Sequence, residues 1–300
     1  PRLHEMVAMT VARDMGPSVI TNGWLLPRRL DKLARAGLKT VYVSIDSDKL
    51  DQHERNRGLK GVRERIRTAN ARMRALGMTS CAQVTVNKLI SDYHALVPTL
   101  EELGFAALTF SYPQRARLGS TSLAWSNDSN LVNFSDAELT HALDEVNELR
   151  SEIQVNNPRA SIADIKRLLA VEPQRFVCYG GYKSFYMDWN YDVWRCDMWD
   201  RPMCSVWEFG NAALIRDGCT ACIADCYRDS SVMLHFAVSI SDALHDIKRG
   251  RILSALKTLA DSRNLTSLGA VVENAGILKH LARTGRSDVV PEVGVEPTRF

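Results

Sequence analysis

The sequence predicts an α/β fold with parallel strands, followed by a small cysteine-rich β-hairpin/α segment and a group of C-terminal helices. Over residues 1–112, short apolar runs alternate with helical patterns at a period of roughly 25 to 40 residues, which is typical of parallel βα units. Six of the seven cysteines lie together in residues 178–226. From 232 to 283 the pattern is helical throughout, with breaks near Gly250, Asn264 and Gly276.

The expected strands and helices of the first part take turns along the chain. The strand candidates are short runs rich in apolar and β-branched residues, at 18–20, 40–46, 81–87 and 106–111. The helix candidates, each followed by a glycine, are 3–15, 27–36, 59–76 and 91–103. Pro98 lies inside the last of these, so that helix is expected to kink there or to begin late.

Polar or aromatic side chains follow each expected strand at the point where it ends. They are Asn22, Ser44, Asp46, Asn87, Ser111 and Tyr112. In parallel α/β folds, ligands bind at the carboxyl ends of the strands. Any single one of these residues could simply begin a loop. Four strand ends in register predict a pocket, because polar groups that converge on one edge form a site.

Two helices are expected to connect the strands to the cysteines. Residues 114–134 are polar and irregular, which is typical of a loop or a flap over an active site. A capping box at Ser135–Glu138 begins one helix, and Ser161 begins another. We assign 135–175 to this bridge and 285–300 to a disordered tail.

The cysteines are spaced like metal ligands. Cys178 and Cys196 flank an aromatic segment with a hairpin turn expected at 189–192, and such a hairpin brings its two ends together. Soft thiolates supplied in pairs favour an iron–sulfur cluster or zinc, with disulfides and unligated thiols as the remaining alternatives. The expected ligands are Cys178, Cys196, Cys219 and Cys222, with Cys226 competing for the fourth place and Cys204 less suited.

Composition excludes several classes of protein. The chain is 45% hydrophobic and 24% charged, as in ordinary globular proteins. Its net charge of +3 is small and its basic residues are dispersed, so nothing indicates a nucleic-acid partner. No apolar run is long enough to span a bilayer, so we expect no transmembrane segment. Sparse cysteines in an odd number, without a secretory signal, indicate reduced thiols and a cytoplasmic protein.

Residues 1 to about 228 resemble radical S-adenosylmethionine enzymes that carry a C-terminal auxiliary-cluster domain of the SPASM or shorter twitch type. The resemblance lies in the order and spacing of several motifs rather than in any one of them. The motifs are Thr21-Asn22-Gly23, Ser44-Ile45-Asp46, His53 with Arg57-Gly58, Val84-Thr85-Val86-Asn87, and the cysteine region.

The resemblance implies a partial (β/α) TIM-like barrel that is missing its first strands. The partial radical-SAM barrel would span 1–134, the bridging helices 135–175, the SPASM/twitch-like cluster domain 176–230 and the C-terminal helices 231–284. By analogy with the family, the barrel would hold S-adenosyl-L-methionine and the cysteine domain an auxiliary [4Fe-4S] cluster. Ferredoxin or flavodoxin would donate electrons for hydrogen-atom abstraction from a small-molecule, peptide or lipid substrate.

The same resemblance assigns roles to individual side chains. It implies cofactor-binding roles for Asn22, Ser44, Asp46, Asn87 and Tyr112, with Gln83, Thr85 and Phe110 as further candidates. Short carboxylate and hydroxyl side chains suit a ribose diol, which needs hydrogen-bond donors and acceptors at close range. It implies metal-ligand roles for Cys178, Cys196, Cys219, Cys222 and Cys226.

The sequence departs from the family pattern at one point. The CxxxCxxC motif that holds the radical-generating cluster is missing, and Cys81 stands alone in an expected strand, where it reads as a core residue. We therefore expect an N-terminally incomplete polypeptide that is inactive alone. The alternatives are a zinc-binding interaction module and a non-functional fragment.

Overall fold

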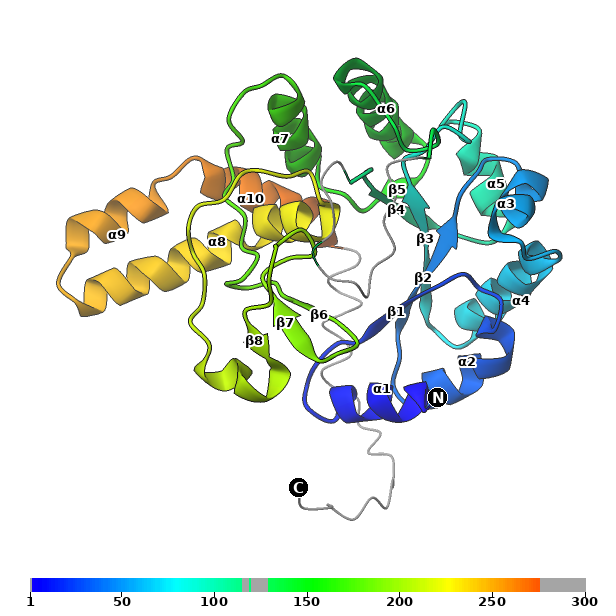
Figure 1. The fold of residues 1–300 in the computed structure, drawn as a ribbon, viewed down its shortest axis with the longest axis horizontal. Helices are drawn as coiled ribbons and strands as arrows, with labels where there is room; N and C mark the ends of the chain where they lie inside the picture. The colour runs from blue at the N-terminus through cyan, green and yellow to red at the C-terminus, as the bar shows by residue number, and fades with distance from the viewer. Residues whose placement is uncertain (1, 115–118, 120–128, 276–300) are drawn as a thin grey trace, which may run out of the picture.

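The computed structural model of this protein describes residues 2–114, 119 and 129–275. Its larger part is a five-stranded parallel sheet whose strands lie side by side in chain order (Figure 1). The strands are β1 (Ser18–Thr21), β2 (Thr40–Ile45), β3 (Thr79–Thr85), β4 (Ala107–Ser111) and β5 (Gln154–Val155). Because neighbouring strands are all parallel, their carboxyl ends meet at one edge. The α/β fold with a parallel sheet is thereby confirmed.

The helices that precede, connect and follow the strands complete the hydrophobic core. They are α1 (Leu3–Val11), α2 (Leu26–Arg35), α3 (Leu50–Arg57), α4 (Val62–Ala75), α5 (Leu96–Glu102), α6 (Asp136–Glu148) and α7 (Arg159–Leu169), with a 3₁₀ turn at Leu149–Ser151 after α6. The capping box that begins α6 is present, since Ser135 and Glu138 each bond the other's backbone N–H. Buried side chains from the strands and from α2, α4, α5, α6 and α7 form one continuous core.

The two faces of the sheet differ in chemistry, as β2 illustrates. Val41, Val43 and Ile45 are fully buried and belong to the core shared with the helices. Tyr42 and Ser44 alternate with them, so they point to the opposite face and are only partly buried. The sheet therefore has an apolar face under its helices and a more polar face turned away from them.

The turn after β1 depends on a glycine. Gly23 has φ of +81°, a left-handed conformation that costs glycine little. A Cβ atom at this position would lie 2.6 Å from Cγ1 of Ile66 in α4. The Thr21-Asn22-Gly23 motif therefore lets the chain turn sharply while it packs directly on α4.

The cysteine region forms a second, antiparallel sheet. Its strands are β6 (Tyr186–Met187), β7 (Asp192–Trp194) and β8 (Cys204–Ser205), and a 3₁₀ helix spans Val206–Asn211. Asp188 holds the β6–β7 turn, because its carboxylate accepts hydrogen bonds from the backbone N–H groups of Asn190 and Asp192. The expected hairpin is confirmed, and β8 is an additional strand that periodicity did not indicate.

Three helices follow the cysteine region. They are α8 (Asp225–Lys248), α9 (Ile252–Leu259) and α10 (Arg263–Glu273), so the breaks expected near Gly250 and Asn264 are confirmed. Helix α8 begins seven residues before the expected start at 232, because its first two turns carry polar residues. Within the described ranges, no helix is both long and apolar enough to cross a membrane. The expected break at Gly276, the tail at 285–300 and most of the 114–134 loop lie outside the described residues.

Two elements of the structure were not predicted from the sequence pattern. Helix α3 is almost entirely polar, with only Leu50, His53 and Glu54 buried, so it has no apolar stripe to reveal it. Strand β5 has two residues, too few for a period, and it follows the 3₁₀ turn at Leu149–Ser151. Helix α5 begins at Leu96, which is the late start that Pro98 predicted.

Candidate functional site

The polar face of the parallel sheet carries a row of hydrogen-bonding side chains near its carboxyl edge. Ser44, Gln83 and Thr109 are register partners on β2, β3 and β4, so they lie side by side on one face. Two residues further along the strands, on the same face, Thr85 is the register partner of Ser111. The amide of Gln83 donates a hydrogen bond of 2.6 Å to the hydroxyl of Ser111. These side chains come from strands separated in sequence and form the kind of lining that a polar ligand requires.

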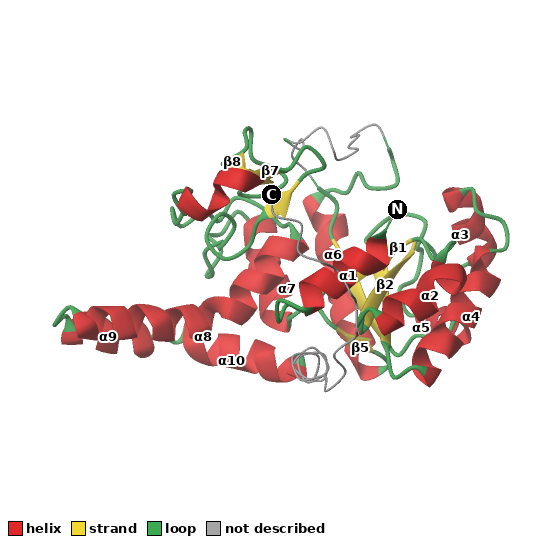
Figure 2. Ribbon diagram, turned by 90° about the horizontal axis from the view of Figure 1, so that it is seen from below, coloured by secondary structure: helices red, strands yellow, loops and turns green. Residues whose placement is uncertain are grey.

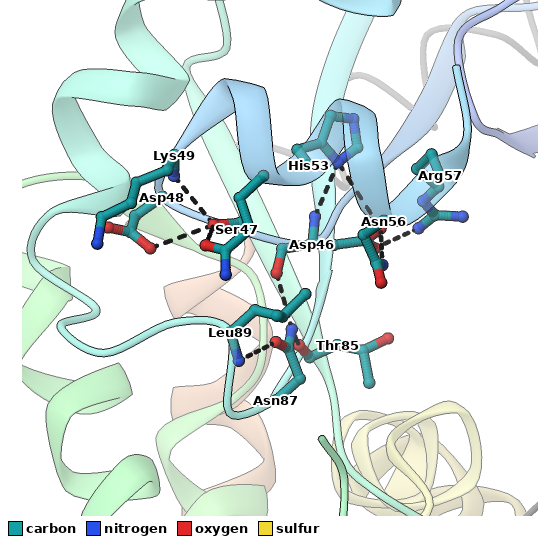
Figure 3. A network of polar contacts seen from close by, with 11 residues as sticks. Asp46, Ser47, Asp48, Lys49, His53, Asn56, Arg57, Thr85, Asn87 and Leu89 are labelled. Carbon is teal, nitrogen blue, oxygen red and sulfur yellow. Dashed lines mark hydrogen bonds and ion pairs between the residues drawn. The ribbon is translucent and has the colours of Figure 1, made fainter. Parts of the chain in front are cut away.

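Asp46, which follows β2, is held by residues of α3 (Figure 3). Arg57 Nη2 lies 2.5 Å from Oδ1, and Asn56 Nδ2 donates a hydrogen bond of 2.8 Å to Oδ2. Nδ1 of the fully buried His53 lies 3.3 Å from the backbone N of Asp46 and 3.7 Å from Oδ2. Burial would raise the pKa of Asp46, but the contacts with His53, Arg57 and Asn56 outweigh it and lower the pKa to about 2. This carboxylate is therefore ionised and already paired.

Asn87, which follows β3, joins the two strand ends. Its Nδ2 donates hydrogen bonds to the backbone oxygens of Asp46 (3.0 Å) and Thr85 (2.7 Å). Its Oδ1 accepts a hydrogen bond of 2.8 Å from the backbone N–H of Leu89. The structure brings Asp46 and Asn87 together, as expected, and it uses the polar atoms of Asn87 to fix the backbone (Figure 3).

The other three cofactor candidates occupy different surroundings. Asn22 is exposed, and its Oδ1 accepts a hydrogen bond of 3.1 Å from the backbone N–H of Trp24. Ser44 belongs to the polar row described above. Tyr112 is only 2% exposed, and its hydroxyl has no hydrogen-bond partner among the described residues. Tyr112 is therefore the one expected cofactor residue with a buried polar atom that the described chain leaves unsatisfied.

Two carboxyl groups that sequence reasoning missed lie beside Ser111 and Tyr112. Asp225 and Asp229 occupy successive turns of α8. Ser111 Oγ donates a hydrogen bond of 3.2 Å to Asp225, and Asn157 Nδ2 donates one of 2.7 Å to Asp229. Ser161 donates a second hydrogen bond to Asp229. No described lysine, arginine or histidine forms an ion pair with either carboxyl.

These carboxyls ionise less readily than Asp46. Burial and the nearby charge of Asp225 raise the pKa of Asp229 to about 7, despite its hydrogen bonds. Burial also raises the pKa of Asp225 to about 6, and Asp197 in the cysteine region adds to the effect. The pKa of Asp197 is itself raised by burial. Groups that titrate near neutrality can give up or accept a proton, and the ionised forms can bind a cation. No signal in the sequence distinguished these aspartates, because α8 was expected to begin at 232.

Four of the cysteines come together around Ala224 and Tyr227. Cys178 is buried there, and the partly buried Cys196, Cys219 and Cys222 pack against the same cluster. The backbone N–H of Cys178 donates a hydrogen bond of 2.8 Å to the carbonyl oxygen of Cys219. The three segments that the sequence analysis paired are therefore neighbours. All seven cysteines are free thiols.

An ion pair joins the two halves of the thiol cluster. Arg195 is fully buried, and its Nη1 and Nη2 atoms each lie 2.5 Å from one carboxylate oxygen of Asp217. Asp217 Oδ1 also accepts a hydrogen bond of 3.1 Å from the backbone N–H of Cys219. Arg195 precedes Cys196, so this pair fixes the hairpin end against the start of the CxxC loop. A bidentate arginine–carboxylate contact gives that junction a defined geometry.

Burial acts on the ionisation of two of these thiols. Burial, with the neighbouring Cys178 and Cys219, raises the pKa of Cys222 to about 12. Burial is also the main cause that raises the pKa of Cys196. Among the described residues, no group of three or more histidine, cysteine, aspartate or glutamate side chains is arranged to hold a metal ion. The cluster thus gathers four soft ligands, but their side chains do not have the arrangement of a metal site.

The other three cysteines have different surroundings. Cys226 is in the first turn of α8, where burial and the charges of Asp225, Asp197 and Cys222 raise the pKa of its thiol. Cys204 is in β8 opposite Val193. Cys81 is buried in β3, as expected of a core residue, and burial raises its pKa to about 12. A cavity of about 150 Å³ lined by Gln114, Met198, Cys222 and Ile223, among others, leads to the cluster.

Comparison with known proteins adds no assignment. No family model matches the chain, and none of the curated proteins compared with it is similar enough to count as a relative.

Proposed function

We propose that this chain is part of a radical S-adenosylmethionine enzyme whose cysteine region holds an auxiliary [4Fe-4S] cluster. The observation that carries the proposal is the convergence of Cys178, Cys196, Cys219 and Cys222 from three separate segments onto one cluster. Four cysteine thiolates are the usual ligand set of such clusters. Metal binding would deprotonate the thiols, including those of Cys196 and Cys222, whose pKa burial raises.

The parallel sheet supports the same proposal. Strands that follow one another in chain order, all parallel, are what a partial (β/α) barrel requires, and its interior would be the polar face. Ser44 and the buried Tyr112 hydroxyl would contact S-adenosyl-L-methionine, and Gln83, whose amide already donates to Ser111, would lie beside Ser44 on the same face. Asp46 and Asn87 would act indirectly, by fixing the strand ends, because their side chains already bind the protein. The cofactor would supply the radical chemistry.

The carboxyls of α8 would serve the substrate in this enzyme. Asp225 lies between the polar face and the cysteine region, since it contacts Ser111 and follows the CxxC loop directly. Its raised pKa lets it exchange a proton with a bound ligand near neutral pH. Asp229 positions α8 against Asn157 and Ser161.

One observation favours a second candidate, a zinc-binding module. The 300 residues contain no CxxxCxxC motif, so the cluster that would cleave S-adenosyl-L-methionine has no ligands in this chain. Four thiolates around a small β-hairpin also suit tetrahedral zinc, which would brace the hairpin against the CxxC loop.

Anaerobic reconstitution with iron and sulfide, and separately with zinc, tests both candidates. We expect a brown protein with about four irons per chain, in line with a four-thiolate cluster. Cys178→Ser and Cys222→Ser should lose the bound iron, whereas Cys81→Ser should retain it because Cys81 lies in the sheet core. A colourless protein with one tightly bound zinc would replace the first candidate by the second, and failure to retain either metal would reject both.

A further inference from the structure

The hairpin formed by α8 and α9 reverses the usual pattern of burial. Along residues 240–259, the buried side chains are those of Ala243 and Ala255, which are small. The large apolar side chains face outward instead: Leu253 is 77% exposed, Leu256 58% and Leu244 54%. Figures 1 and 2 both show this hairpin projecting away from the two sheets. It therefore presents its apolar residues where no other described part of the chain covers them.

Helical spacing gathers these residues into stripes. On α8, the exposed Ile240, Leu244 and Ile247 lie four and three residues apart, which places them on one side of the helix. On α9, Ile252, Leu256 and Leu259 have the same spacing and are all exposed. Exposed apolar stripes of this kind mark a candidate interaction site.

The end of the hairpin is also basic. Its cations are Lys248, Arg249, Arg251 and Lys257. Arg251 is paired with Asp246 at 2.5 Å. Lys248, Arg249 and Lys257 are exposed and form no ion pair with any described residue. Three uncompensated positive charges thus stand beside the exposed leucines.

We propose that the end of the α8–α9 hairpin binds to an anionic lipid surface. Leucine and isoleucine side chains would enter the boundary between headgroups and acyl chains, and the cations would contact anionic headgroups. The hairpin would lie on the surface without spanning it. This surface is separate from the thiol cluster and does not depend on the proposed function.

Charge favours a lipid surface over a second copy of the chain. The nearby carboxylates Asp242, Asp246 and Asp261 are each already paired with an arginine. A second hairpin would therefore bring more cations to the interface and no free carboxylates to match them. An anionic bilayer supplies the missing charge.

Co-sedimentation with vesicles tests the proposal. The full chain is mixed with phosphatidylcholine vesicles, with and without phosphatidylglycerol, at low and high salt. We expect binding only when phosphatidylglycerol is present, and weaker binding at high salt because salt screens the attraction. The double substitution Lys248→Glu with Arg249→Glu should weaken binding at least about 30-fold, since each basic residue near the surface contributes about 1 kcal/mol.

Leu253→Ser with Leu256→Ser should weaken binding at least about tenfold without unfolding the protein, because both side chains are exposed. The matched controls are Arg28→Glu with Lys60→Glu, and Leu3→Ser with Leu25→Ser, which change exposed residues of the part that holds the parallel sheet. These should bind as the wild type does. Equal binding to neutral vesicles, or no vesicle binding, would overturn the proposal. A dimer in light scattering that Leu253→Ser with Leu256→Ser abolishes, without vesicle binding, would assign the surface to a second copy.

Discussion

Asp46, which is buried, and Asp229, which is partly buried, are carboxyl groups near the carboxyl ends of the same sheet, and their pKa values shift in opposite directions. The pKa of Asp46 falls to about 2, whereas that of Asp229 rises to about 7. Both accept two side-chain hydrogen bonds, so the number of bonds does not explain the difference. The charge of the neighbours does: Asp46 faces a guanidinium, and Asp229 faces neutral donors and a second carboxyl, Asp225.

The comparison separates two kinds of buried carboxyl. A carboxylate that is paired with a cation stays ionised, and it serves to fix the backbone around it. A carboxyl without a cation keeps a proton near neutrality, and burial makes that state costly to change. The second kind is the one that can respond to a ligand, because a bound cation or base shifts its protonation. Asp225 and Asp229 are therefore the more informative residues for function.

The largest expected effect comes from removing the cation beside Asp46. Arg57→Met leaves a mostly buried carboxylate without its charged partner, so it should lower the free energy of unfolding at pH 7 by about 3 kcal/mol, at the low end for buried pairs because Arg57 is partly exposed. Urea denaturation measures the change. Arg55→Met is the control, since Arg55 is exposed and forms no described ion pair.

The pH dependence checks the same pair. The wild-type pKa of Asp46 is lower than in the unfolded chain, so its contribution is present above about pH 4 and is lost as the pH falls toward 2. In Arg57→Met the pKa of Asp46 in the folded state should rise toward or above its unfolded value, so the loss of stability between about pH 4 and pH 2 should shrink or reverse. Equal stability of the two arginine variants would show that Arg57 does not stabilise the Asp46 carboxylate.

A smaller effect of opposite sign is expected at Asp229. Its raised pKa means that the folded state binds a proton that the unfolded state releases between about pH 4 and pH 7. Asp229 therefore costs stability as the pH rises through that window. Asp229→Asn removes the ionisation and can keep the bonds to Asn157 and Ser161, so it should raise the free energy of unfolding above pH 7 by about 2 kcal/mol.

The check is the pH profile of urea denaturation from pH 4 to 8. Asp229→Asn should flatten the decline in this range, while Asp14→Asn, a substitution of an exposed aspartate, should leave it unchanged. A steeper decline in Asp229→Asn than in the wild type would mean that Asp229 is ionised and stabilising in the folded protein.

Local sequence pattern accounts for what could be predicted. Strands β1 to β4 have apolar runs ended by polar residues, and the partners of Asp46 are only 10 and 11 residues away along the chain. The hairpin between Cys178 and Cys196 likewise depends on neighbouring residues. Such features leave a signature within one window of sequence.

Long-range assembly accounts for what could not. The hydrogen bonds of Asp225 and Asp229 join residues 114, 72 and 68 positions apart, so no local pattern marks them. Helix α3 and strand β5 show no apolar period in the sequence. Packing against the rest of the fold, rather than intrinsic propensity, determines these two elements. The spacing of the cysteines indicated a common site, and the fold brings four of them together.

The smallest expected effect distinguishes Asp225 from Asp229. Ser111 Oγ donates to Asp225, a bond that favours the ionised carboxylate. Ser111→Ala removes that donor, so the pKa of Asp225 should rise above about 6 by a fraction of a unit, equivalent to under about 1 kcal/mol. Carboxyl ¹³C chemical shifts followed through a pH titration report both aspartates separately. Thr85→Ala, at the register partner of Ser111, should leave both unchanged. If Ser111→Ala moved Asp229 as much as Asp225, the two carboxyls would titrate as one coupled pair, and a ligand that binds either would change the protonation of both.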